Sequence, residues 1–365
     1  MKYYPEDNRT WIEIDKSTAA NNLMVIRSFT GNTPIYATVK SNAYGHGLSL
    51  FSKLMEENGV DGFCVDTVPE GVYLRDEGIT KPILVLGYSL PEEWVEAKEK
   101  NITISISSLS SLEKICSMDN SPEFHLKVDT GMRRQGIFPE EAEKAASIIN
   151  SSGKSLKGLF THFSSAKDIN YPAFSDRQLE LFERTAASLA EKGITGFIKH
   201  VSATGGALIS DKYHLDMVRV GIGLYGYYPS KELEIQLGDI GLKPVMRWKT
   251  AISEIKDAKK GDYVGYDLTE KILADTRIAV IPVGYWHGLP RALSGIAELL
   301  VNGKKCKILG RISMDMTIID VGNSNAKAGD EVLIMDDASV LARIIGGSYY
   351  EIMTRTNPAI KRILV

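Results

Sequence analysis

The sequence has few cysteines, no long apolar run and little net charge, and each of these absences excludes a class of protein. Cys64, Cys116 and Cys306 are odd in number and far apart, so they predict neither a disulfide framework nor a metal site, and we expect them to be reduced core residues. No run of about eighteen apolar residues occurs, and the amino terminus has no apolar signal segment. A net charge of −3 gives no indication of a nucleic-acid or membrane partner. We therefore expect a cytoplasmic protein.

The first two thirds of the chain alternate short apolar runs with amphipathic stretches. This spacing is typical of strands alternating with helices, and the eight runs favour a TIM barrel over the alternative, a doubly wound sheet. Helix signals occur between them, for example over 175–193, where Ser175 is a candidate N-cap and Gly193 a C′ residue. The apolar runs are 35–40, 62–67, 82–87, 102–107, 124–130, 156–163, 198–204 and 215–226.

After about Lys243 the pattern changes to alternating strands punctuated by glycine turns, with one short helix at 338–346. Residues 9–15 also alternate and precede the first run of the barrel. The 365 residues are enough for both parts. The sequence therefore predicts a barrel domain over 12–243 and an all-β domain over 244–365, joined by an amino-terminal strand over 1–11.

The stretch TVKSNAYGHG, residues 38–47, places a lysine at the end of a buried β-branched run. Lys40 would then lie at the carboxyl end of a barrel strand, where this fold carries its chemistry. A lysine partly removed from water there can act as a nucleophile or base. A lone lysine more often extends its amine into solvent. The residues at the neighbouring strand ends therefore have to be considered before choosing between these two interpretations.

Polar and cationic groups also follow the later strands, in HLKVDTGMRRQG, LFTHFSSAKD, KHVSATGG and VRVGIGLYG. Taken singly, His162 or His200 is explained as a hydrogen-bonded core histidine and Arg219 as the partner of a structural carboxylate. Together with Lys40 they describe one pocket. Thr204 and the backbone N–H groups of residues 221–222 follow strands seven and eight, the usual phosphate site of the fold. This combination suggests pyridoxal phosphate held by Lys40 as a Schiff base.

With these residues in view, the sequence closely resembles the alanine racemase family over nearly its whole length. The resemblance implies a fold type III pyridoxal-phosphate enzyme, a TIM barrel with a carboxyl-terminal β domain. It also implies an isomerase that interconverts L-alanine and D-alanine, a precursor of peptidoglycan. The motifs that carry the resemblance are VKSNAYGHG, KVDTGMRRQG, VRVGIGLYG, VGY at 264–266 and GRISMDM at 310–316.

The resemblance also implies how the cofactor is held. Lys40 would form the internal aldimine, and Arg219 would face the pyridine nitrogen, which a permanently charged arginine leaves unprotonated. His162 and His200 would line the cofactor, with His162 placed to orient Arg219. The phosphate would be held by Tyr44, Thr204, Gly221 and Ile222. The family usually adds a second phosphate-contacting tyrosine, and that position aligns here with Pro358.

The remaining roles implied by the resemblance concern proton transfer, the substrate and the partner subunit. Lys40 and Tyr266 would be the two opposed bases, because racemisation removes a proton from one face of Cα and returns it on the other. Tyr266 and Met314 would come from the second subunit of a homodimer with shared active sites. Arg134 and Met314 would lie near the substrate carboxylate, and Lys127 matches a lysine that is carbamylated in many relatives.

Some positions depart from the family pattern. Trp286 and His287 stand where the family commonly has Ala-Asp, and Ser313 stands where Cys is common. The tyrosine missing at 358 would leave room for a side chain larger than methyl, so a racemase preferring serine or a broader set of amino acids is the alternative. The residues that still match the substrate passage are Asp168, Tyr285, Arg291 and Arg311.

Three other functions have weaker support. The related decarboxylases of basic amino acids carry a triple-glycine phosphate loop and a Cys-Glu-Ser segment, and neither occurs here. A metal-dependent hydrolase using His162 and His200 lacks a carboxylate-histidine spacing, so no metal is expected. A noncatalytic pyridoxal-phosphate carrier would not need the β domain.

Overall fold

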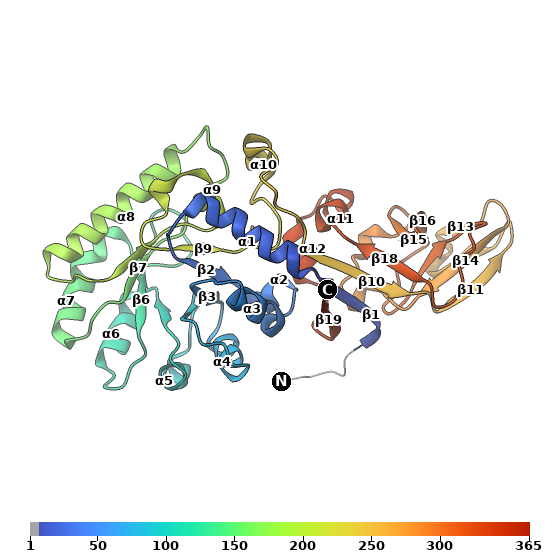
Figure 1. Ribbon diagram of the computed structural model, residues 1–365. Helices are drawn as coiled ribbons and strands as arrows, with labels where there is room; N and C mark the ends of the chain where they lie inside the picture. The colour runs from blue at the N-terminus through green and yellow to red at the C-terminus, as the bar shows by residue number, and fades with distance from the viewer. Residues whose placement is uncertain (1–6) are drawn as a thin grey trace. The chain divides into compact units, whose positions relative to one another are not determined.

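The computed structural model describes residues 7–365, which divide into two compact units (Figure 1). We call residues 17–43 and 51–243 the barrel unit. The β unit comprises, among the described residues, 7–16, 44–50 and 244–365.

The barrel unit is built on parallel strands that pair in chain order. Two four-stranded sets, β9-β2-β3-β4 and β5-β6-β7-β8, are joined where the Val85 N–H donates to Thr103 O (2.9 Å) and the Arg219 N–H to Ser202 O (3.0 Å). This closes a TIM barrel, so the predicted fold is confirmed. Among the described residues its strands are β2 (Ile35–Thr38), β3 (Gly62–Val65), β4 (Ile83–Val85), β5 (Ile104–Ile106), β6 (Phe124–Lys127), β7 (Gly158–Phe160), β8 (Ile198–His200) and β9 (Val218–Val220).

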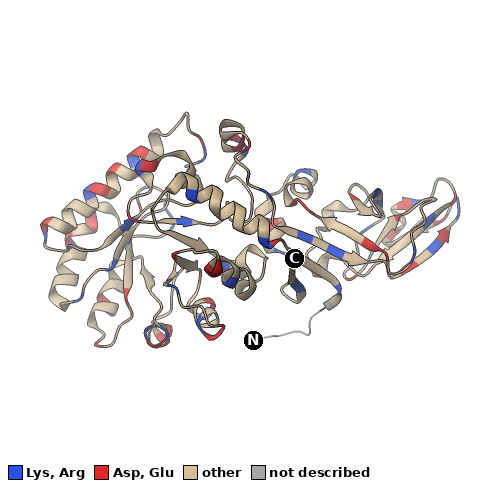
Figure 2. Cartoon of the chain, viewed as in Figure 1, with Lys and Arg blue, Asp and Glu red and all other residues tan. Residues whose placement is uncertain are grey.

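Helices follow the strands and cover the outside of the barrel (Figure 1). On α8, Arg lies beside Asp and Glu, as the outer helices of a solvated barrel require (Figure 2). The longer helices are α1 (Lys16–Thr30), α3 (Leu48–Glu57), α4 (Val68–Asp76), α6 (Leu109–Ser117), α7 (Ala142–Ser152) and α8 (Ala173–Glu191). The shorter ones are α5 (Trp94–Glu99), α9 (Thr204–Ile209) and α10 (Lys231–Leu237).

One predicted helix start is wrong. Helix α8 begins at Ala173, directly after Pro172, and Ser175 is buried in its first turn instead of capping it. The fixed φ of proline suits the start of a helix, whereas the apolar periodicity becomes visible only later. The predicted end is confirmed, because Gly193 follows the C-cap Lys192 with a φ of +82°.

The β unit contains a sheet in the order β11-β14-β17-β16-β15-β18-β10-β1-β19. Strand β1 (Asp7–Ile14) pairs antiparallel with β10 (Met246–Ala251) and parallel with β19 (Ile360–Leu364), so the amino-terminal strand belongs to this unit. The remaining strands of the sheet are β11 (Glu254–Ala258), β14 (Thr276–Ile281), β15 (Glu298–Val301), β16 (Lys304–Leu309), β17 (Thr317–Asp320) and β18 (Glu331–Met335).

The β unit also contains a short hairpin and two helices. A two-stranded hairpin, β12 (Tyr263–Val264) and β13 (Glu270–Lys271), lies outside the sheet. Helix α11 (Ala338–Ile345) confirms the predicted short helix, and α12 (Tyr349–Thr354) follows it.

The barrel strands are buried almost throughout, and the three cysteines are buried and unpaired, as expected. None of the helices within residues 7–365 has both the length and the apolar character that a membrane span requires.

Candidate active site

Strand β2 ends two residues before Lys40, and the chain then takes a left-handed turn. Ser41, Asn42, Ala43 and Tyr44 have φ values of 56°, 58°, 51° and 52°. Only asparagine among these four residue types visits this region at all readily, so such a run is costly. The turn ends at Gly45, and α3 begins three residues later. Lys40 is therefore followed directly by an unusual left-handed backbone.

The Lys40 amine lies against a carboxylate that we did not predict. Its Nζ is 3.1 Å from Oδ1 of Asp66, the first residue after β3. Glu70 on α4 holds the two chain segments together, because its carboxylate accepts the N–H of Ser41 (2.7 Å) and the N–H of Asp66 (2.8 Å). The rule that selected Lys40, a polar residue at a barrel strand end, also applies to Asp66.

Arg219 on β9 is buried, 2% exposed, and both terminal nitrogens of its guanidinium contact barrel groups. One terminal nitrogen donates to Thr161 O (2.8 Å) and Val201 O (3.1 Å), and the other contacts Nδ1 of His200. We expected His162 to orient Arg219, but the imidazole that contacts the guanidinium is that of His200. Residue 200 lies on β8, beside β9, which explains the direct contact.

His200 continues this chain of contacts to a second imidazole. Its Nε2 is 2.9 Å from Nδ1 of His125 on β6. An arginine can only donate, so His200 accepts at Nδ1, donates from Nε2, and leaves the proton of His125 on Nε2. A Cβ at Gly158, which pairs with His125 across β6 and β7, would lie 2.5 Å from the His125 ring, so glycine makes room for it.

Burial first, and then the charge of Arg219, lower the pKa values of both imidazoles. The pKa of His125 falls to about 3, and that of His200 is also well below its usual value. Burial also lowers the pKa of Arg219 to about 10, which leaves the guanidinium charged at neutral pH. The chain thus fixes one buried positive charge with two neutral histidines behind it.

A small pocket at the ends of β6 and β7 brings together Lys127, Arg134 and His162. Its loop is ordered by Asp129, whose carboxylate accepts the N–H groups of residues 131, 133 and 134 at 2.9 to 3.0 Å. The Lys127 amine donates to Oε1 of Gln135 (3.3 Å).

Cations surround this pocket and act on its titratable groups. Desolvation, followed by the charges of Arg134, Arg219 and Lys40, lowers the pKa of Lys127 to about 8. Desolvation and the same cations lower the pKa of His162 to about 3, although its side chain keeps some solvent exposure. Positive charge therefore converges on these strand ends, as an anionic ligand requires.

The loops after β8 and β9 meet at Thr204. Its Oγ1 accepts the N–H groups of Gly221 (3.2 Å) and Gly223 (3.3 Å), which leaves the hydroxyl proton available to donate. The neighbouring residue Ile222 is buried. The predicted residues Thr204, Gly221 and Ile222 are thus brought together.

Tyr44 belongs to the β unit, where a tyrosine of the carboxyl-terminal segment packs beside it. The rings of Tyr44 and Tyr350 are 6.1 Å apart, and burial raises the pKa of Tyr350. We expected this segment to lack a tyrosine at the site, with Pro358 in its place. Residue 358 is a proline, and the tyrosine beside Tyr44 is Tyr350, eight residues earlier. The missing phosphate contact at 358 stays a prediction.

Arg362 fixes the loop that follows Tyr44. Its guanidinium donates to the carbonyl oxygens of Gly45 (3.1 Å), Asn357 (2.7 Å) and Thr356 (3.3 Å), to the Thr356 hydroxyl (3.2 Å), and to Ile360 O. Burial lowers its pKa to about 10. The Tyr44 loop and the carboxyl-terminal segment are therefore joined within the β unit.

The predicted residues of the β domain also gather at one edge of their unit. Arg311 forms an ion pair with Asp267 (2.7 Å), one residue after Tyr266. The N–H groups of Tyr285 and Trp286 donate to the carbonyl oxygens of residues 313 and 314 at 3.0 and 2.9 Å. Tyr266 and Met314 are 66% and 54% exposed, so this edge presents large side chains to solvent.

Three other predicted positions have different surroundings. His287 is buried and accepts the Gly284 N–H at Nδ1 (3.2 Å). Arg291 is exposed in a short 3₁₀ turn. Asp168 lies on the barrel unit, where it accepts the N–H of Asn170 (2.8 Å) and the amide of Gln236 on α10 (2.5 Å).

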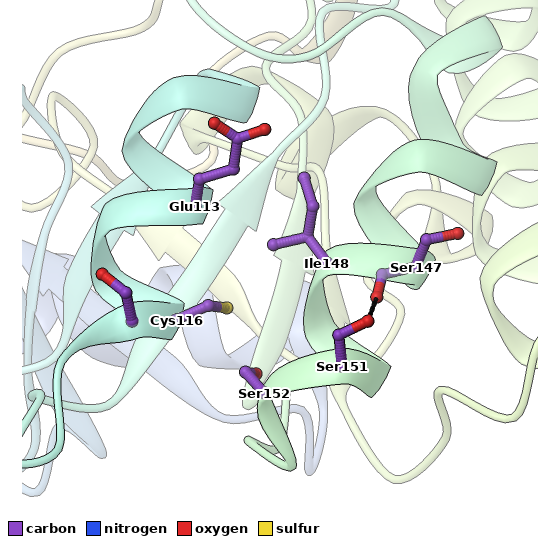
Figure 3. A pocket seen from close by; sticks show the side chains of 7 residues that line it. Glu113, Cys116, Ser147, Ile148, Ser151 and Ser152 are labelled. Atoms are coloured by element: carbon purple, nitrogen blue, oxygen red, sulfur yellow. Dashed lines mark hydrogen bonds between the residues drawn. The ribbon is translucent and has the colours of Figure 1, made fainter.

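A hollow between α6 and α7 lies on the outer helices of the barrel (Figure 3). None of the residues predicted for catalysis or binding lines it. The labelled side chains are Glu113, Cys116, Ser147, Ile148, Ser151 and Ser152.

Comparison with known proteins gives this arrangement a family. The family profile of the alanine racemase N-terminal domain matches residues 14–229, and that of the C-terminal domain matches residues 245–364. An alanine racemase of Leptospira interrogans is 34% identical over 98% of this chain and 96% of its own length. One of Methanococcus maripaludis is 37% identical over 89% of this chain and 88% of its own.

Solved structures agree with the sequence comparison. An alanine racemase of Clostridium difficile 630 superposes with a TM-score of 0.91 at 31% identity, covering 98% of this chain and 96% of that one. The crystal structure of alanine racemase from Bacillus anthracis with bound L-Ala-P gives a TM-score of 0.91 at 30% identity, covering 100% and 96%.

Proposed function

The chain belongs to the alanine racemase family, and from this membership we infer that it interconverts L-alanine and D-alanine with pyridoxal 5′-phosphate as its cofactor. The observation that carries the proposal is the convergence of positive charge around a strand-end lysine. Lys40 follows β2, Arg219 lies on the paired strand β9, and Lys127 and Arg134 face the same strand ends.

The residues present fit this cofactor. Lys40 supplies the amine for a covalent bond to its aldehyde. The Thr204 hydroxyl and the N–H of Ile222 would supply hydrogen-bond donors for the phosphate, beside Gly221, whose own N–H donates to Thr204. We propose Tyr44 and Tyr350 as two further phosphate contacts. Arg219 would face the ring nitrogen. When bound, pyridoxal phosphate withdraws electrons from Cα of an attached amino acid and so acidifies its proton.

The protein's own part in the reaction is to hold and move that proton. We propose that Lys40 serves one face of Cα and Tyr266 the other, which racemisation requires. Arg219 remains charged because its partner His200 is a neutral acceptor. A charged arginine would donate to the ring nitrogen of the bound cofactor without giving up its proton, which would favour return of the proton to Cα over transamination.

Arg134 would bind the substrate carboxylate, with Met314 beside it. The lowered pKa of Lys127 supports a carbamate on that residue, because only a neutral amine reacts with carbon dioxide. A carbamate would turn the buried cation into an anion among Arg134, Arg219 and Lys40.

The second base requires a second copy of the chain. Tyr266 and Met314 lie in the β unit, and exposed Leu268 and Met316 extend the apolar surface of its edge. Exposed apolar patches of this kind are typical of protein interfaces. We propose a head-to-tail homodimer in which each edge completes the partner's site. The cytoplasmic location expected from the sequence stays a prediction.

A borohydride experiment tests the cofactor and its attachment. The purified protein should be yellow, and reduction should fix the cofactor on Lys40, as peptide mapping would show. The control is Lys40→Ala, which should retain no label. A label on another lysine in the wild-type protein would remove Lys40 from the proposal.

A substrate panel tests the reaction. Single L-amino acids would be incubated with the enzyme and the D products measured on a chiral column. Alanine should be the best substrate. A preference for serine or another amino acid would overturn the assignment.

A further inference from the structure

The buried face of helix α8 carries a glutamine where the helical pattern favours an apolar residue. Phe182, Ala186 and Leu189 are buried on this face, and Gln178, one turn before Phe182, is 0% exposed. Burying an amide is costly unless its donors and its acceptor find partners. A methionine of similar length would avoid this cost, so the hydrogen bonds of Gln178 are what the amide contributes at this position.

Both polar atoms of the Gln178 amide contact the loops that leave the carboxyl ends of β6 and β7. Its Oε1 accepts the N–H of Ser164 (2.9 Å), and its Nε2 donates to the carbonyl oxygen of His162 (3.3 Å) and to Oγ1 of Thr130 (3.2 Å). The backbone partners fix the orientation of the amide, because an N–H only donates and a carbonyl oxygen only accepts. Gln178 therefore connects the two loops through one planar group.

The two connected loops carry side chains of the candidate site. Thr130 belongs to the segment that leads to Arg134, and its Oγ1 lies 2.8 Å from Oγ1 of Thr161 in the segment after β7. The carbonyl oxygen of Thr161 accepts the Arg219 guanidinium (2.8 Å), and His162 lines one small pocket together with Arg134. The amide is thus bonded to the backbone segments that position the groups of this pocket.

Helix α8 also packs directly on the loop after β6. A Cβ at Gly131 would lie 3.2 Å from the ring of Phe174 and 3.8 Å from Cγ of Gln178, and the φ of Gly131 is +145°. Asp129 orders the same loop by accepting the N–H groups of residues 131, 133 and 134. The loop is therefore held by Asp129 at its base and by Gln178 from the helix.

Resting on the proposed function, we propose that Gln178 is a positioning residue for substrate binding. By holding the loop after β6 to the loop after β7, its amide keeps the Arg134 guanidinium at the place where the substrate carboxylate binds. This contact is the same before and during proton transfer, because the carboxylate takes no part in the transfer. Its loss therefore raises KM and leaves kcat nearly unchanged.

Two variants and a matched control test this role in the full chain. Gln178→Met keeps the length of the side chain and removes its three hydrogen bonds. Gln178→Glu keeps the acceptor for the Ser164 N–H and loses at least one of the two donated bonds. The control is Thr185→Val on the same helix, because Thr185 is also buried (2% exposed) and its hydroxyl donates to Leu181 O within the helix (2.8 Å).

The first measurement is steady-state kinetics with L-alanine, and the second is backbone hydrogen exchange of the protein stripped of cofactor. Both Gln178 variants should raise KM about three- to tenfold, the range that one lost hydrogen bond supports, with kcat within about twofold of wild type. The N–H groups of residues 131, 133 and 134 should exchange about three- to tenfold faster, whereas those of β2 and β3 should be unchanged, because the opening is local. Thr185→Val should match wild type in both measurements.

An unchanged KM, a fall in kcat alone, or loop exchange as slow as in wild type would overturn the role of Gln178. The same changes in Thr185→Val would also overturn it, because a general loosening of α8 would then explain them. Loss of the wild-type circular dichroism spectrum in both Gln178 variants would overturn it as well, because the amide would then serve the whole fold. A wild-type protein that does not racemise alanine would instead overturn the proposed function, while hydrogen exchange would still show whether Gln178 holds the loop.

Discussion

Replacing Lys127 by methionine should stabilise the barrel at neutral pH, although it removes a residue proposed for the site. The Lys127 side chain is 6% exposed and surrounded by cations. Methionine has a similar length and no charge. The substitution therefore removes the cost of keeping an ammonium in this pocket, and it gives up the hydrogen bond to Gln135 and the contact of the amine with the Phe160 ring.

The size of the effect follows from the pKa of Lys127. It lies at about 8 in the folded chain, against about 10.4 for an unfolded lysine. Between these two values the unfolded chain binds more protons, so the free energy of unfolding of the wild type rises with pH across this window. The full rise corresponds to about 3 kcal/mol. Subtracting about 1 kcal/mol for the lost contacts leaves an advantage of about 2 kcal/mol for Lys127→Met at pH 7.

Urea unfolding of both proteins, without cofactor and in buffer free of carbon dioxide, measures this difference. The advantage should disappear by about pH 10.5. Bicarbonate should then raise the stability of the wild type alone, with a carbamate signal in ¹³C NMR. A difference in stability that is the same at pH 7 and pH 10.5 would refute the reasoning.

Three further predictions concern the β unit. Tyr266→Phe should keep the yellow colour but lower the rate of racemisation by roughly 10²- to 10⁴-fold. NMR in heavy water should show the α-proton of D-alanine exchanging much faster than that of L-alanine. Equal exchange from both enantiomers would exclude Tyr266 as the second base. Leu268→Glu should weaken self-association in sedimentation experiments because it charges the exposed edge, and an unchanged dimer would place the interface elsewhere. Arg362→Lys should lower the free energy of unfolding by about 2 kcal/mol and weaken cofactor binding, because an ammonium cannot replace the five hydrogen bonds to the Tyr44 loop and the carboxyl-terminal segment. An unchanged cofactor affinity would show that Arg362 does not act on the site.

The barrel could be predicted from the sequence because its signals are local. Each strand is a short apolar run, and the chain order of the strands is also their order around the barrel, so Lys40, Arg219 and Thr204 fall at strand ends that must meet. The stop of α8 at Gly193 is equally local, since it requires only a left-handed glycine.

The partners of these residues could not be predicted, because they depend on register and on distant segments. Which histidine contacts Arg219 depends on how β8 lies beside β9, and the apolar pattern does not distinguish His162 from His200. Asp66 faces Lys40 only because Cys64 pairs with Thr38. Tyr350 reaches Tyr44 across about three hundred residues of chain, and no spacing rule covers such a contact.

The left-handed turn after Lys40 makes the chemistry of this lysine a property of the complete fold. Four consecutive residues in this conformation cost on the order of 4 to 8 kcal/mol, which is comparable to the whole net stability of a typical domain. A chain without its tertiary contacts cannot maintain such a turn, so it must form together with the packing that stabilises it. In a partly folded chain Lys40 is therefore an ordinary lysine on a relaxed backbone. Selective reaction of Lys40 with an aldehyde would therefore indicate that the chain has reached its complete fold.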